Sequence, residues 1–409
     1  MLNRIWLGFF LIAFVACLYQ ATVGGQPEVV AAAVDASFKA AKTSVEIALG
    51  LTGLLCFWLG LFQIAEKAGL IEKMAWMLAP LFRRLMPEVP AGHPATGSVT
   101  MNLAANMLGL DNAATPLGLK AMKDLQTLNP VPDTATNAQI LFLVLNTASV
   151  TLIPVTVFLY RAQFGAANPA SVFVPILITT TVGTLAGLLM VAWIQKLKLL
   201  DRVVMAYAAG LAALMGLVVA AVVSAPPEML GVRSAFVGNL LLLSIIVLFL
   251  LAGWRKGIDV YDAFITGAKQ GFEVAIGLIP FLVAMLVAVA VFRASGAMDV
   301  LLNGVAVVFA WLGANTDFVP ALPTAIMKSL SGSGARAMMI ETIQTYGVDS
   351  FPARVAAIIQ GSSETTLYVL AVYFGSVGIR KERHALACGL FADLVAVIVA
   401  ILVAYWFFH

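Results

Sequence analysis

Four short polar stretches interrupt an otherwise apolar chain, and they carry most of the side chains that could do chemistry. They are NLAANMLGLDNAAT (102–115), NTASVT (146–151), KSLSGSGAR (328–336) and QGSSETT (360–366). Carboxamides and hydroxyls both donate and accept hydrogen bonds, so these stretches suit an uncharged polar solute. The glycines of SGSG could also expose backbone N–H groups at the start of a helix, which favours an anion.

Glu364 is the carboxylate of the last stretch, and three roles are open to it. It could bind a ligand, carry a proton, or be the buried partner of Lys328 or Arg336, because charges inside membranes are usually paired or functional. The hydroxyls and amides have a competing role, since Ser, Thr and Asn also hold membrane helices together. The candidate substrate-binding residues are Asn102, Asn106, Asp111, Asn112, Asn146, Thr147, Ser149, Lys328, Ser329, Ser331, Ser333, Gln360, Ser362, Ser363, Glu364 and Thr365.

The composition places these stretches in an integral membrane protein. Of the 409 residues, 61% are hydrophobic and only 11% are charged, whereas soluble domains have about 25% charged residues. A net charge of +3 is too small to indicate nucleic acid binding. The three cysteines and three histidines are scattered without metal-ligand spacing, so the sequence predicts no disulfide, no metal site and no cofactor.

Nine apolar segments are long enough to span a membrane, which takes roughly 20 residues. Residues 70–130 and 297–347 fit badly, because short apolar pieces alternate there with Gly, Pro, Asn and Ser, as in broken or re-entrant helices. We expect the first segment to be an uncleaved helix rather than a signal peptide. The predicted spans are 5–23, 45–65, 137–160, 171–195, 203–223, 235–253, 272–292, 352–374 and 385–407.

An internal repeat organises the chain. DASFKAAKTSVEIALGL (35–51) matches DAFITGAKQGFEVAIGL (262–278), and VLNTASVTLIPVTVFLY (144–160) falls opposite IIQGSSETTLYVLAVYF (358–374). In the first match each glutamate follows a lysine by four residues, which predicts a helical ion pair at the membrane edge more than a binding role. The repeat gives an N-terminal helix (1–30), a first repeat (31–198), a two-helix linker (199–255) and a second repeat (256–409).

Basic loops set the expected orientation, because short cytoplasmic loops carry an excess of Lys and Arg. QKLKLLDR (195–202), WRK (254–256) and GIRKER (378–383) are placed in the cytoplasm, so the second repeat starts there. Arg4 places the N-terminus inside, so the first repeat starts from the outer face. Inverted repeats with interrupted helices are typical of secondary transporters, whose sites lie near the midplane.

The sequence offers no specific sign of an enzyme. No HExxH, GxSxG or phosphate-binding glycine motif occurs in its expected context. We therefore assign no catalytic residue and expect no enzymatic activity.

Long motifs connect both halves to one family. FWLGLFQIAEKAGLIEKMAWMLAPLFRRLMP and TGSVTMNLAANMLGLDNAATPLGLKAM resemble spore maturation protein A, while IMKSLSGSGARAMM and IIQGSSETTLYVLAVYFGSVGI resemble spore maturation protein B. The resemblance covers nearly the whole chain and implies a natural fusion of two nucleoside-recognition, or gate, domains. Related gate domains occur in concentrative nucleoside transporters and in ferrous iron transporter B. The iron transporter's gate is expected to use a cysteine near its pore, and the polar stretches here have none.

These patterns together predict an all-α integral membrane protein of two inverted gate-type repeats with broken or re-entrant helices. We expect it in a bacterial inner membrane, translocating a small polar solute such as a nucleoside by alternating access. The alternative is a non-transporting protein that binds a ligand or lipid headgroup and regulates an envelope partner. Pairing into a homodimer is also open.

Overall fold

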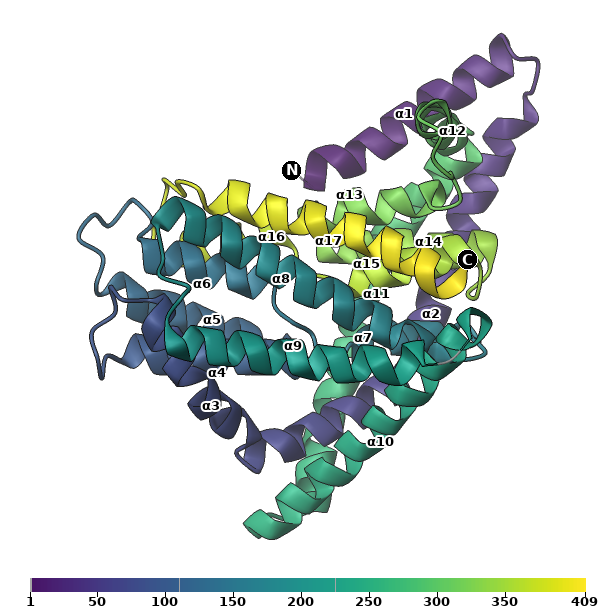
Figure 1. The fold of residues 1–409 in the computed structure, drawn as a ribbon. Coiled ribbons are helices and arrows are strands. Elements are labelled where there is room, and N and C mark those ends of the chain that lie inside the picture. The colour runs from purple at the N-terminus through teal and green to yellow at the C-terminus, as the bar shows by residue number, and fades with distance from the viewer. Residues whose placement is uncertain (1, 110, 225) are drawn as a thin grey trace.

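The chain is helical throughout its described length (Figure 1). The computed structural model describes residues 2–109, 111–224 and 226–409, without the side chains of residues 2, 111–113 and 227. Eight helical segments of this described chain are long and apolar enough to cross a membrane. The prediction of a multi-span helical membrane protein is therefore confirmed.

Two runs of seven helices follow the same order. The spacing that separates Asp35 from Asp262 also separates Lys67 from Ala294, the last residues of the first helix in each run. The first run is α2 (Glu28–Lys67), α3 (Leu70–Leu85), α4 (Pro94–Met107), α5 (Asp111–Gln126), α6 (Asn137–Thr147), α7 (Val155–Gln163) and α8 (Phe173–Gln195). The second is α11 (Val260–Ala294), α12 (Ala297–Trp311), α13 (Leu322–Leu330), α14 (Gly332–Tyr346), α15 (Phe351–Gly361), α16 (Thr366–Ser376) and α17 (Ala385–Phe408).

Three further helices lie outside the two runs. One precedes them, α1 (Leu2–Thr22), and two join them where the sequence predicts a linker hairpin, α9 (Arg202–Val223) and α10 (Leu230–Lys256). A short 3-10 turn, η2 (Pro227–Met229), lies in this linker, while η1 (Pro169–Val172) lies inside the first run and η3 (Val319–Ala321) inside the second.

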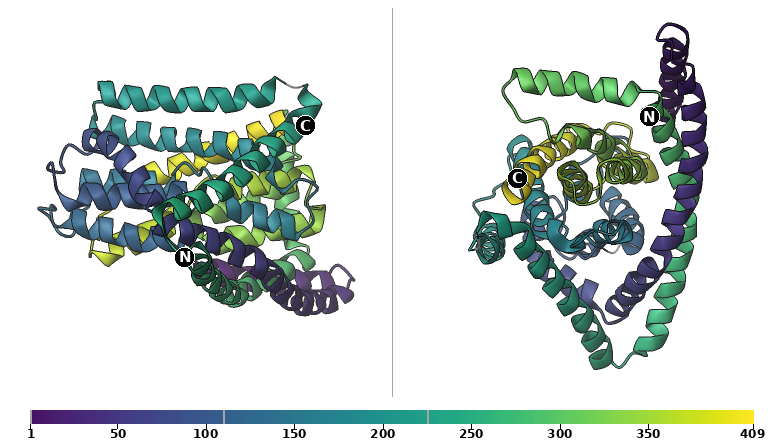
Figure 2. Two further views of the ribbon diagram at one scale, coloured as in Figure 1. Left: turned by 90° about the horizontal axis from the view of Figure 1, so that it is seen from below. Right: turned by 90° about the vertical axis from the view of Figure 1, so that its right-hand side faces the viewer.

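Helices α2 and α11 form one long pair along the edge of the molecule (Figure 2). They contain 40 and 35 residues, so α2 is roughly 60 Å long at 1.5 Å per residue. The apolar core of a bilayer is only about 30 Å thick. The predicted spans 45–65 and 272–292 are thus the middle parts of longer helices, which can fit a bilayer only by tilting or by extending beyond it.

Small residues let α2 and α11 approach closely and show that they run antiparallel. A Cβ on Gly271 would overlap the backbone of Cys56, and one on Gly267 would overlap the carbonyl of Leu59. Later residues of α11 therefore meet earlier residues of α2. Close approach through small residues is the usual way in which membrane helices gain van der Waals contact.

Helices α8 and α17 repeat this antiparallel pairing inside the molecule. The Cβ position of Gly183 faces Ala396, and that of Gly187 faces Ala392. Equivalent helices of the two runs thus pair in opposite directions in two separate places.

The predicted span 352–374 is confirmed as the candidate span Phe351–Ser376. The structure adds that the helices over 137–160 and 352–374 are interrupted. The first is interrupted at 148–154, between α6 and α7, and the second at 362–365, between α15 and α16. Pro154, which precedes α7, has no N–H to continue a helix. Thr365 is extended (φ −86°, ψ 102°), so α15 cannot run on into α16.

The two regions predicted to be broken do contain short helices. In the first, α4 and α5 pack against each other, and in the second α13 and α14 do the same. In Figure 1 these two pairs lie toward opposite ends of the molecule, with the interrupted helices between them. Figure 2 (right) shows this core surrounded by longer helices, of which α2 and α11 form one side.

Enlarging Gly267 should separate α2 from α11. We expect Gly267→Val to lower the free energy of unfolding by about 1–3 kcal/mol, as overpacking of a well-packed interior does. The measurement is the thermal unfolding midpoint of the purified protein in detergent. Gly277→Val is the matched control, because Gly277 lies in the same helix with no neighbouring atom within 4 Å. Equal melting temperatures for the two variants would contradict the close pairing.

Candidate functional site

The two interrupted helices meet at their breaks. The backbone N–H of Glu364 donates to the carbonyl oxygen of Thr147, the last residue of α6, at 2.7 Å. Around this contact α6 packs on α16, and α7 packs on α15. The centre of the molecule is therefore built from four half-helices, two from each run, and the second and fourth polar stretches lie side by side as the repeat predicts.

An amide cluster of the first run lies on one side of the breaks. The Asn146 side chain donates to Asn102 at 2.5 Å, and Asn102 donates to the Ala114 carbonyl at 2.6 Å. The hydroxyl of Tyr373 on α16 lies near both asparagines. Tyr373 stacks on Phe142 with ring centroids 5.9 Å apart. Sequence reasoning missed Tyr373, because an aromatic residue in an apolar run carries no polar signal.

A carboxyl cluster of the second run lies on α17. One oxygen of Asp393 accepts hydrogen bonds from the hydroxyls of Ser329, at 2.7 Å, and Thr366, at 2.8 Å. The ammonium of Lys328, the residue before Ser329, donates to the carbonyl of Gln360 at 2.7 Å. The apolar pattern of 385–407 predicts an ordinary span and assigns no role to Asp393. The detectable signal was one acidic residue within the apolar run of α17.

A groove of about 840 Å³ opens beside the break between α15 and α16. Its apolar wall comes mainly from α16, with Phe281 of α11 opposite. Ser331 caps the start of α14 by accepting from the Gly334 N–H at 3.1 Å, and its hydroxyl lies 3.2 Å from that of Ser333. The polar lining is Ser331, Ser333, Arg336, Glu364, Thr365 and, at the far end, Glu382.

Arg336 borders two cavities. Besides the groove it lines a smaller pocket of about 120 Å³ between α7 and the α2–α11 pair. There its guanidinium lies 5.7 Å from the ring centre of Tyr160, a distance at which the cation is attracted to the ring face. Arg336 is therefore a charged group shared by the groove and the smaller pocket.

The predicted site residues differ in their environments. Glu364 is exposed in the groove and takes part in no ion pair among the described residues, so it is not the buried partner of Lys328 or Arg336. The hydroxyls of Thr147 and Ser362 bond to carbonyls of their own helices, which is a structural role. Asn106, Ser149 and Ser363 are at least partly buried, and the side chains of Asp111 and Asn112 lie outside the described residues.

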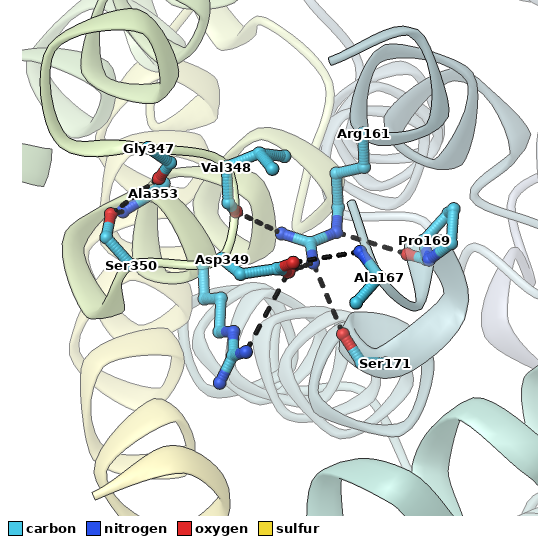
Figure 3. Close-up of polar contacts among 10 residues, drawn as sticks. Arg161, Ala167, Pro169, Ser171, Gly347, Val348, Asp349, Ser350 and Ala353 are labelled. Carbon is cyan, nitrogen blue, oxygen red and sulfur yellow. Dashed lines mark hydrogen bonds and ion pairs between the residues drawn. The ribbon is translucent and has the colours of Figure 1, made fainter. Parts of the chain in front are cut away.

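One end of the paired half-helices is fastened by a buried ion pair (Figure 3). Arg161 of α7 contacts Asp349, which precedes α15, at 2.8 Å, and it also donates to the Val348 carbonyl at 3.0 Å. The Arg161 side chain has no exposed surface. Asp349 in turn accepts from the Ala167 N–H at 2.9 Å. This network joins the two runs where α7 ends and α15 begins.

The opposite end is fastened by an exposed ion pair. Lys381, after α16, lies 3.0 Å from Asp133, before α6, and the backbone N–H of Lys381 donates to the Asp133 carbonyl. The ammonium of Lys381 and the Thr134 hydroxyl hold the pKa of the Asp133 carboxyl below its usual range. The contact is therefore complete at neutral pH and is lost as the pH falls through that lowered pKa. Solvent screening makes it the weaker of the two fastenings.

The fold and the site define a multi-span helical membrane protein with two equivalent polar regions. Residues 48–164 and 275–380 match the family model described as Gate, nucleoside recognition. The chain belongs to this nucleoside-recognition family and contains two matching regions.

Two relatives identify its halves more closely. Spore maturation protein B of Bacillus subtilis (strain 168) is 45% identical over 159 residues, which are 39% of this chain and 88% of that protein. Spore maturation protein A of the same strain is 37% identical over 189 residues, which are 46% of this chain and 93% of that protein. They match different halves, as in a fusion of the two. No solved structure matches the chain.

Removing the charge of Asp349 should cost far more than removing that of Asp133. We expect Asp349→Asn to lower the free energy of unfolding by about 3 kcal/mol, because it leaves the buried Arg161 without its counter-ion. Asp133→Asn is the matched control and should leave the unfolding midpoint close to that of the unmodified protein. Both are measured by thermal unfolding in detergent at neutral pH. An equal loss in the two variants would show that burial of the pair does not matter.

Proposed function

We propose that the protein translocates a small polar solute across the membrane. The observation that carries this proposal is the groove, which runs from Glu382 and Ile379 beyond α16 to the break between α15 and α16. A groove that leads to interrupted helices supports transport, because unpaired backbone groups at membrane depth are tolerated beside a water-filled cavity or within protein.

The antiparallel pairing of equivalent helices supports an inverted repeat. Helices α2 and α11, α8 and α17, and the two interrupted helices each pair in opposite directions. In this proposal α4–α5 and α13–α14 are re-entrant hairpins that enter from opposite faces. An inverted repeat allows alternating access, because each half can adopt the conformation of the other.

The two ion pairs, Arg161–Asp349 and Lys381–Asp133, differ in exposure, which fits one state of an alternating-access cycle. The Arg161 side chain is fully buried in its ion pair, whereas the groove leads toward the end that carries the exposed Lys381 pair. If basic loops mark the cytoplasm, the groove is accessible from the inside. The opposite state would break the Arg161–Asp349 contact and close the groove.

The lining of the groove favours a solute with hydroxyl, amide or anionic groups. Ser333 and Thr365 can donate and accept, Arg336 can bind an anion, and Glu364 can accept from hydroxyl or amine donors. A nucleoside has groups of these kinds, and the nucleoside-recognition family description agrees with such a ligand. A lipid headgroup fits the same chemistry. We assign the groove a binding and not a catalytic role.

Uptake by proteoliposomes tests the proposal. The purified protein is offered labelled nucleosides, inorganic ions and water-soluble phospholipid headgroups at a fixed pH gradient. We expect one of these classes to accumulate. Glu364→Gln should reduce the initial rate about tenfold, the equivalent of one charged hydrogen bond of 1.4 kcal/mol.

Glu46→Gln is the matched control, because Glu46 is an exposed glutamate on α2 whose partner Lys42 lies 3.8 Å away. It should leave the rate unchanged. An equal loss in both variants would exclude a specific role for Glu364. If the protein binds one of the compounds but moves none, transport is wrong and a ligand-binding protein that regulates a partner takes its place.

A further inference from the structure

Asp393 is the most unusual charged residue of the membrane-spanning helices. It lies within α17, an otherwise apolar helix of 24 residues that follows the second interrupted helix. Its exposed fraction is only 4%. An ionised carboxylate is costly at such a position, and acidic residues inside membranes commonly take part in proton or ion pathways.

Hydroxyls from two moving parts of the proposed transporter converge on this carboxyl. Ser329 belongs to α13, the first helix of the second hairpin, and Thr366 is the first residue of α16. Ser363, within the break, also lies near this carboxyl. The other carboxyl oxygen is buried without a hydrogen-bond partner among the described residues. The negative charge is thus stabilised on one oxygen and left without a donor on the other.

Lys328 supplies the positive charge nearest to this carboxyl. It is 5% exposed and precedes Ser329 on α13. Its ammonium bonds to the carbonyl of Gln360 near the end of α15, where helix carbonyls lack partners, and it attracts Asp393 electrostatically. A movement of α13 would therefore shift a cation and a hydroxyl donor together relative to the carboxyl.

The other helices that contact α17 bring few competing charges. Helices α6 and α8 have no ionisable side chain, and α16 contributes Tyr368 and Tyr373. The charged groups of the remaining contacting elements lie at their ends: Arg354 on α15 near Asp349, Glu228 on η2, and Arg233, Arg255 and Lys256 on α10. On α17 itself the neighbouring groups are Cys388 and, before the helix, His384.

We propose that Asp393 is the proton-binding site that couples to movement of the α13–α14 hairpin. The inference rests on the proposed transport function and names its coupling ion. When Asp393 is ionised, it accepts from Ser329 and attracts Lys328, so α13 is held against α17. When it is protonated, the attraction is lost and α13 is released. Conversely, movement of Lys328 away from the carboxyl promotes proton uptake, as thermodynamic linkage requires.

A proton fits this cluster better than a metal cation. The ammonium of Lys328 would repel a metal cation near Asp393. The hydroxyl of Thr366, which begins α16, can accept from the protonated acid, whereas the attraction between the carboxylate and Lys328 of α13 is lost. Glu364, exposed in the groove, has none of these features and would contact solute.

Infrared difference spectroscopy on the full chain in nanodiscs detects the proton directly. Lowering the pH should produce a carbonyl band of a protonated carboxyl group that is missing in Asp393→Asn. Glu364→Gln is the matched control and should retain the band. A band that persists in Asp393→Asn, or one lost in Glu364→Gln instead, would overturn the proposal.

Hydrogen–deuterium exchange, corrected for intrinsic rates, tests the coupling. Peptides from 322–346 should lose protection as the pH falls, whereas peptides from 94–126, the equivalent hairpin, serve as the internal reference and should not. Asp393→Asn should abolish the transition, and so should Lys328→Met, because each removes one partner of the attraction that holds α13 against α17. A transition that is unchanged in Asp393→Asn would contradict coupling. Neither readout uses a solute, so failure of the uptake experiment leaves both results interpretable.

Discussion

The hydrogen bond from the Glu364 N–H to the Thr147 carbonyl is the contact on which the interior depends. An interrupted helix leaves donors and acceptors without partners, and each unpaired group costs several kcal/mol where water is absent. Here the acceptor left at the end of α6 meets a donor left in the break before α16. Each interruption helps to satisfy the other, so neither run could hold this arrangement alone.

The rest of the molecule maintains that meeting point. Small residues bring α2 to α11 and α8 to α17 without intervening side chains. Polar contacts then connect the runs at both ends, through Arg161 and through Lys381. The amide cluster at Asn102 belongs to the first run, and the carboxyl cluster at Asp393 belongs to the second. Polar residues are thus concentrated where the two runs touch, and apolar residues cover the lipid-facing surface.

Sequence patterns predicted the class of protein and its repeat, because both depend on features that can be recognised in the linear sequence. Hydropathy identified the spans, and the matched blocks at Asp35 and Asp262 fixed the equivalence of α2 and α11. Hydropathy could not predict the interruption at 148–154, because TASVTLIP contains enough apolar residues to extend a span. Helix breaks depend on backbone conformation and on a partner for each freed group, which are properties of the folded pair.

The site, too, was predicted from the sequence only in part. Residues of the polar stretches do gather around the breaks, as symmetry suggested, but Glu364 contributes its backbone to the centre and its side chain to the groove. Asp393 and Tyr373 were missed because each is a single residue within an apolar run, and its meaning comes from neighbours on other helices. The side chain of Asp111, also singled out from the sequence, lies outside the described residues.

Carrying both runs in one polypeptide has a consequence for how the protein can change. In a homodimer of two identical chains, every substitution would occur in both chains. A new carboxylate would then occur at both equivalent positions. In this chain the spacing that relates Glu364 to Val150 also relates Asp393 to Thr179, a buried threonine that bonds to its own helix. Covalent linkage fixes the stoichiometry at one to one. It therefore lets a position in one half carry a carboxylate while the equivalent position in the other half carries an uncharged residue.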